Sequence, residues 1–79
     1  MKEFIEYLIK HIVDNPDAVH ISEVVGQQTV VFELRVGDGD ISKVIGKQGR
    51  TAQSLRTLLE AKGAKQGKRI MLEILDDKK

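Results

Sequence analysis

Apolar residues recur at helical spacing at the start of the chain. Residues 14–17, Asp-Asn-Pro-Asp, end this pattern, because proline disfavours helical geometry in the residue before it. The pattern predicts one amphipathic helix that stops at this Asp-Asn-Pro-Asp segment. Its apolar positions are Phe4, Ile5, Leu8, Ile9, Ile12 and Val13.

Two segments with a period of two follow, over residues 19–25 and 29–36. Alternation of this kind predicts strands with one buried side. The segment Gly26-Gln27-Gln28 between them is short enough for an antiparallel hairpin. The apolar positions expected to face inward are Val19, Ile21, Val25, Val30, Phe32, Leu34 and Val36.

The second half of the chain predicts two helices and a last strand. Asp40 stands where its side chain can cap a short helix, and a longer helix follows Gly49, with Gly63 as its C-terminal stop. A third alternating segment gives the last strand, and residues 76–79 are expected to fray. The positions expected to face inward are Ile41, Val44, Ile45, Ala52, Leu55, Leu58, Leu59, Ile70, Leu72 and Ile74.

This order of elements predicts the topology of the sheet. The hairpin makes the first two strands antiparallel, and two helices between the second and third strands form a crossover that makes those strands parallel. Each strand has one consistently apolar face, so all helices should pack on one face of a three-stranded mixed sheet. We therefore expect an α+β fold of two layers, in the order α-β-β-α-α-β.

Length and composition fit one small globular domain. With 79 residues we expect a single domain over residues 1–79, whose small core would gain from self-association as a homodimer. The chain has no cysteine, which excludes disulfides and thiolate metal sites. Its first helix carries acids and lysine through the apolar stretch, unlike a signal peptide or a membrane span. We expect a cytoplasmic protein that does not bind membranes.

The charges are separated along the chain. Residues 1–40 carry eight acidic and three basic side chains, a net charge of −5, whereas residues 41–79 carry four acidic and ten basic ones, a net charge of +6. Between Lys43 and Arg69 the only acid is Glu60. Such a segment indicates an anionic partner, with a solvated basic surface as the alternative.

Two glycines interrupt the helical pattern in this basic segment, at Gly46-Lys47-Gln48-Gly49. Glycine allows left-handed backbone angles and close approach of another backbone. The following helix would direct its free N–H groups and positive dipole end at this loop, where a phosphate can bind. Lys47 and Arg50 add positive charge there. The alternative is a helical corner that needs glycine for steric reasons only.

The segment VIGKQGRTAQSLRTLL, residues 44–59, resembles the signature of KH domains, with residues 46–49 as the Gly-X-X-Gly loop. A helix and strand hairpin placed before the core is similar to the bacterial type II arrangement. The resemblance covers the whole chain and is closest to the KhpA (YlqC-like) family of small single-domain bacterial KH proteins. It implies binding of single-stranded RNA, as an RNA chaperone or post-transcriptional regulator.

The resemblance also implies a set of binding residues. The loop would clamp the sugar–phosphate backbone with Lys47 and Arg50 as charge partners. Bases would rest on an apolar floor beside the second strand, for which the candidates are Val44, Ile45, Ala52 and Leu55. Residues 62–68 would form a basic loop along the far wall. The implied RNA-binding residues are Gly46, Lys47, Gln48, Gly49, Arg50, Lys43, Val44, Ile45, Ala52 and Arg56.

The low aromatic content indicates the mode of recognition. Phe4, Tyr7 and Phe32 are the only aromatic residues, so there is no stacking platform of the kind that other RNA-binding folds use. We expect backbone-led binding with little sequence specificity. The KH resemblance implies a heterodimer partner of the KhpB (Jag, EloR) type and an influence on cell elongation and the envelope. An interaction module without RNA is the competing class.

Enzymatic sites are not indicated. The loop lacks the first glycine and the Ser or Thr of a phosphate-binding Walker A motif. Residues 38–42 begin like a calcium loop, but Lys43 stands where that motif requires glycine. His11 and His20 have no third ligand at a recognisable spacing. We therefore expect no enzyme activity, no metal and no cofactor.

Overall fold

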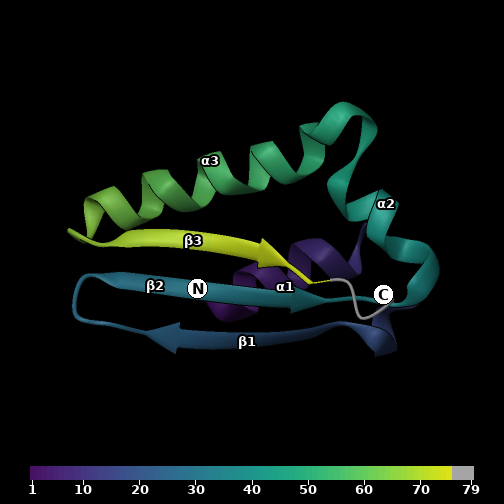
Figure 1. The fold of residues 1–79 in the computed structure, drawn as a ribbon, viewed down its shortest axis with the longest axis horizontal. Coiled ribbons are helices and arrows are strands. Elements are labelled where there is room, and N and C mark those ends of the chain that lie inside the picture. Colours follow the sequence, from purple (N-terminus) through teal and green to yellow (C-terminus); the bar gives the residue numbers. More distant parts are fainter. Residues whose placement is uncertain (76–79) are drawn as a thin grey trace.

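The computed structural model describes residues 1–75, so the expectation for residues 76–79 lies outside the described range. Short 3-10 turns join its elements. The elements are α1 (Lys2–Lys10), β1 (His20–Val25), β2 (Thr29–Arg35), α2 (Ile41–Ile45), α3 (Arg50–Lys65) and β3 (Arg69–Ile74). This is the predicted order, and Figure 1 shows α1 behind the sheet and α3 along β3.

The sheet has β2 at its centre. β1 pairs with it antiparallel, with Ile21 opposite Leu34, and β3 pairs with it parallel, with Leu72 opposite Phe32. The N–H of Gly26 donates to the carbonyl of Thr29 at 2.7 Å and closes the hairpin. The crossover through α2 and α3 brings the chain back parallel to β2. The predicted α+β fold with a mixed sheet is confirmed.

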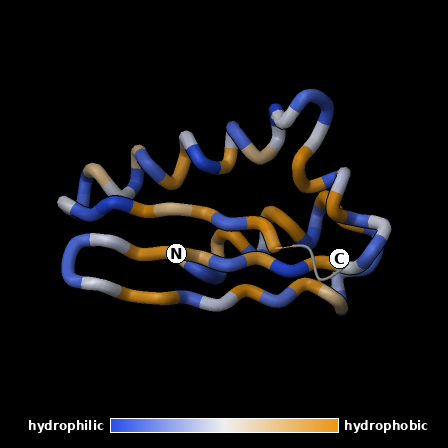
Figure 2. Tube along the Cα trace, in the orientation of Figure 1, coloured by the Kyte–Doolittle hydropathy of each residue, from blue (hydrophilic) through white to orange (hydrophobic). Residues whose placement is uncertain are grey.

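One core lies between the helices and one face of the sheet. Phe32 and Leu34 of β2 are fully buried, as are Ile5 and Ile9 of α1 and, nearly so, Leu59 of α3. Figure 2 shows apolar and polar residues alternating along the strands, as this packing requires. Burying one such side chain is worth about 1.5–3 kcal/mol, so a small number of residues carries much of the stability.

Three residues predicted to face inward are exposed, and one of them is Ile45 at the end of α2, with an exposed fraction of 39%. Val25 is 61% exposed because it ends the edge strand β1 at the hairpin, and Leu58 is 50% exposed. The buried stripe of α3 is formed by Ala52, Leu55, Leu59 and Gly63. At 100° per residue, Leu58 lies about 100° around the helix from the middle of this stripe. The prediction that Leu58 faces inward was wrong, because it rested on the hydrophobicity of the residue and not on its angular position on the helix.

α3 ends later than predicted. Gly63 lies inside the helix, and the structure corrects both the predicted stop there and the predicted loop over residues 62–68. The N–H of Lys68 donates to the Gly63 carbonyl at 2.8 Å, and the N–H of Gly67 donates to the Ala64 carbonyl, with Gly67 at φ +68°. This is a Schellman motif. No helix within residues 1–75, α3 included, is long and apolar enough to cross a membrane.

Asp40 is buried and joins the loop after α1 to α2. The sequence predicted a helix cap, but the side chain of Asp40 makes no capping hydrogen bond. Instead, its two carboxylate oxygens accept the N–H groups of Asp14 at 3.1 Å and Asn15 at 3.0 Å. Asp40 therefore satisfies the backbone of the Asp-Asn-Pro-Asp segment, and this contact connects residues that are distant in the sequence.

The hydrogen bond from Asp14 lowers the pKa of Asp40, with further help from Asn15 and Lys43. A carboxyl whose pKa is lowered by folding stabilises the folded state above its unfolded value of about 3.9, and this contribution is lost as the pH falls through the lower folded value. We expect the melting temperature to fall by several degrees below pH of about 4, measured by circular dichroism.

Replacement of Asp40 tests whether this residue causes the fall in melting temperature in acid. Asp40→Asn should lower the melting temperature at neutral pH and flatten its decline in acid. Asp17→Asn removes the same charge from an exposed position and should keep the native decline. Identical acid profiles for Asp40→Asn and the native chain would show that other carboxyl groups cause the loss.

Candidate nucleic-acid interface

The loop over residues 46–49 is a tight corner between α2 and α3 (Figure 1). Three of its residues have positive φ: Gly46 at 79°, Gln48 at 59° and Gly49 at 75°. The N–H of Gly49 donates to the Gly46 carbonyl at 3.1 Å and closes the turn. The chain thus reverses within four residues, and the N-terminus of α3 faces the outside of the corner.

The two glycines of the loop serve different purposes. A Cβ on Gly46 would lie 2.3 Å from Oγ1 of Thr51 and 2.9 Å from its backbone N, so this position has no room for a side chain. A Cβ on Gly49 would meet nothing within 4 Å. Gly49 is required for its positive φ alone, which costs other residues about 1–2 kcal/mol. The predicted need for glycine is confirmed at both ends of the loop.

Positive charge at the corner is available to a ligand. Lys47, Gln48 and Arg50 are exposed. Within residues 1–75, Lys47 and Arg50 have no ion pair or hydrogen bond from their side chains. α3 is capped by Gly49, which has no side chain to bond the first N–H groups of the helix. The N–H of Arg50 already donates to the carbonyl of Lys47, so what meets at this place is the positive end of the helix dipole and two cations, which favours an anion.

Lys43 differs from the other predicted cations. Its ammonium group is paired with Asp14, and it lies 3.6 Å from Asp40. The hydrogen bond to Asp14 raises the pKa of Lys43. Its charge is thus partly balanced by two carboxylates of the protein itself, and Lys43 links α2 to the loop after α1 instead of being unpaired at the corner.

The predicted apolar floor is only partly accessible. Val44 is completely buried in the core, and Ala52 and Leu55 are 3% and 6% exposed. These three side chains are part of the hydrophobic core, so little of their surface is accessible to a base. Ile45, beside the loop, is 39% exposed. The structure corrects the floor assignment of Val44 and leaves Ile45 as the main apolar surface at this corner.

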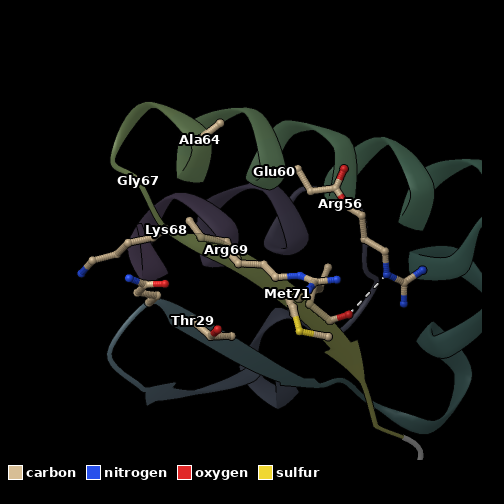
Figure 3. A pocket seen from close by; sticks show the side chains of 11 residues that line it. Thr29, Arg56, Glu60, Ala64, Gly67, Lys68, Arg69 and Met71 are labelled. Carbon is tan, nitrogen blue, oxygen red and sulfur yellow. Dashed lines mark hydrogen bonds between the residues drawn. The ribbon is translucent and has the colours of Figure 1, made fainter.

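A groove of about 720 Å³ runs between α3 and β3 (Figure 3). Arg56 is half-buried, and its Nε donates to the carbonyl of Leu72 at 3.3 Å, the dashed line in Figure 3. Because β3 is an edge strand, this bond uses a carbonyl that the sheet leaves open. The lining residues on the helix are Arg56, Glu60 and Ala64.

The far wall of the groove is shorter than predicted. Gly67, Lys68 and Arg69 line it, together with Thr29 and Met71. Lys62, which we placed in this wall, lies on another side of α3, with its ammonium 5.2 Å above the ring of Phe4. The basic end of the groove is therefore formed by the two cations that follow the helix.

Comparison with known proteins decides the family. A family model described as "KhpA/KhpB, KH domain" matches residues 2–74. The chain belongs to this family of KH domains. The resemblance seen in the sequence is thereby confirmed, and the element order is that of a type II KH fold. No solved structure matches the chain.

Relatives of this KH domain align over nearly their full length. The RNA-binding protein KhpA of Aquifex aeolicus (strain VF5) is 53% identical over 76 residues, which is 96% of this chain and 96% of that protein. The RNA-binding protein KhpA of Chlamydia trachomatis serovar D is 45% identical over 78 residues, 99% of this chain and 100% of that protein. The similarity thus includes the leading helix and hairpin.

Sequence reasoning missed some residues of the groove in this KH domain. Glu60 was noted as the one acid in a basic segment and, with Arg56, as part of the polar side of the long helix, but not as a binding residue. Glu60 follows Arg56 by four residues, and such pairs lie on the same side of a helix. That spacing was a usable signal for Glu60. Nothing in the sequence pointed to Met71 or Thr29, because their place depends on the sheet register.

Proposed function

We propose that this chain binds single-stranded RNA and that the loop over residues 46–49 holds the sugar–phosphate backbone. The observation that carries the proposal is the exposed corner at the N-terminus of α3, where Lys47 and Arg50 are unpaired within residues 1–75. KH domains clamp about four nucleotides of backbone with a Gly-X-X-Gly loop. Curated relatives are named RNA-binding protein KhpA, which supports the same ligand.

In this proposal the protein positions RNA by charge and backbone contacts. The positive end of the α3 dipole attracts phosphate oxygens, and Lys47 and Arg50 neutralise them. Gly46 keeps the corner narrow by packing on Thr51. Arg56, fixed on Leu72, directs the rest of the strand into the groove. Sequence specificity is low, because phosphates carry no sequence information.

The salt dependence of binding tests this mode. With about four phosphate contacts and a slope of about 0.7 for each, the logarithm of the association constant should fall by about 3 per tenfold increase in salt. Fluorescence anisotropy with a short labelled RNA, over a series of salt concentrations, gives the slope. Affinity that does not change with salt would contradict backbone-led binding.

The cellular role that we propose is that of an RNA chaperone or post-transcriptional regulator in the cytoplasm, without enzyme activity. The family model covers both KhpA and KhpB, which supports a KhpB-type (Jag, EloR) protein as a heterodimer partner. Through this pair the chain would influence cell elongation and the envelope. Mixing the two purified proteins and measuring the mass of the product by light scattering tests the pairing.

A second candidate function is a protein dimerisation module whose loop is only a structural corner. Phe4 and Tyr7 of α1 are 37% and 63% exposed, and they favour association with a second copy. Light scattering with Phe4→Ser and Tyr7→Ser separates the candidates. If the variants are monomers that still bind RNA, RNA binding is the function and does not depend on the dimer. If the native chain dimerises and no RNA binds, the module is the function.

A further inference from the structure

The groove between α3 and β3 lies at a defined distance from the loop. Glu60 follows Gly49 by eleven residues, which corresponds to about 16 Å along the helix at 1.5 Å per residue. Four stacked nucleotides span about 14 Å at 3.4 Å each. A strand held at the loop and directed along α3 therefore brings a base to Glu60.

The groove is lined by three cationic side chains and one acidic side chain. Arg56, Lys68 and Arg69 supply the cations, and Glu60 is the one acid among the residues that line the groove. Arg56 is held by the carbonyl of Leu72. The carboxylate of Glu60 is exposed and makes no hydrogen bond or ion pair with any residue from 1 to 75 (Figure 3).

An unpaired carboxylate in this groove weakens binding of phosphate but can accept hydrogen bonds from a base. It repels phosphate, so a groove built only for the RNA backbone would bind better without it. An ionised carboxylate only accepts hydrogen bonds, and its two oxygens suit two adjacent donors. Bases present donors of this kind on their edges, whereas phosphates present none.

We propose that Glu60 is a specificity-determining residue that selects guanine at one position of the bound strand. This inference rests on the proposed RNA binding. Guanine offers N1–H and its 2-amino group side by side on its pairing edge, one for each carboxylate oxygen. Adenine and cytosine pair their amine with an acceptor nitrogen that repels the carboxylate. Uracil places its one N–H between two carbonyl oxygens.

The selection is confined to one base. The loop is about three helical turns away, and its contacts to phosphate are the same for every sequence. The result is weak overall specificity with a single preferred guanine. Thr29 and Met71, on the opposite side of the groove, lie where they can flank the base, since both line it with Glu60.

The test uses short uridine-rich RNAs that differ at one position. The native chain should bind the RNA with guanine about tenfold more tightly than the RNA with adenine or uracil there, in line with the discrimination of a good two-donor contact. Inosine keeps N1–H and lacks the amine, so its RNA should have intermediate affinity. Equal affinity for all these RNAs would overturn the assignment.

Two matched variants separate recognition from charge. Glu60→Gln and Glu73→Gln remove the same charge from exposed positions, so both should raise affinity slightly for the RNAs with adenine or uracil at this position. Only Glu60→Gln should weaken binding of the RNA with guanine. Glu60→Gln alone should bring the ratio of guanine to adenine affinity close to one. An unchanged ratio in Glu60→Gln would refute the role of Glu60.

The experiments distinguish failure of the proposed RNA binding from failure of the proposed guanine selection by Glu60. Salt-dependent binding without a guanine preference would reject the role of Glu60 and leave the proposed function standing. Absence of RNA binding by the native chain would reject both.

Discussion

A protein with Lys47 and Gln48 both replaced by aspartate is expected to bind single-stranded RNA at least about tenfold more weakly than the native chain. A charge-assisted hydrogen bond is worth about 1.5–3 kcal/mol, which corresponds to about 10- to 150-fold in affinity. Lys47→Asp removes one such contact, and both new carboxylates repel phosphate. Both positions are exposed, so folding should be preserved. Anisotropy titration of a labelled RNA measures the loss.

The matched control carries the same charge change elsewhere. Lys2→Asp with Gln27→Asp alters exposed residues of α1 and of the hairpin turn. Its affinity should fall much less, through the change in net charge alone. An equal loss in both double variants would show that overall charge, not the loop, determines binding.

Gly63→Ala is expected to destabilise the fold by up to about 2 kcal/mol. A Cβ at this position would lie 2.6 Å from the carbonyl oxygen of Lys68 and 2.9 Å from Cγ1 of Ile70, so α3 and β3 would have to move apart. Crowding in a packed core costs about 1–3 kcal/mol, against a gain of about 1 kcal/mol from the better helix propensity of alanine. Thermal unfolding followed by circular dichroism measures the net effect.

Gly39→Ala is the control for this change. Gly39 has no positive φ, and a Cβ there would meet nothing within 4 Å. The same substitution should therefore be neutral or slightly stabilising, because alanine restricts the unfolded chain. A melting temperature of Gly63→Ala at or above that of Gly39→Ala would mean that the helix and strand adjust without cost.

The regular pattern of the chain was sufficient to predict the fold. The alternation around Phe32 and Leu72 defined two strands, and the crossover between them defined their direction. Leu58 and Val25 were misplaced because hydrophobicity marks a candidate for burial, while the direction of the side chain and the extent of helical cover decide the outcome. Asp40 was misread because its partners, Asp14 and Asn15, are distant in the sequence.

The loop was predictable because its requirements are local. Positive φ at Gly46 and Gly49 and the helix that follows them can be inferred from a few adjacent residues. The groove was not predictable in the same way, since it is formed by α3, β3 and the start of β2 together. Glu60 acquires its neighbours Lys68 and Arg69 only when the Schellman turn reverses the chain.

The most direct test of RNA binding at the loop is a titration of isotope-labelled protein with a short single-stranded RNA, followed by the amide resonances in NMR. We predict the largest changes at residues 46–50 and smaller ones along the groove, at Arg56, Glu60 and Lys68. The largest changes on the open face of the sheet, at Ser22 and Val24, with residues 46–50 unaffected, would contradict RNA binding at the loop.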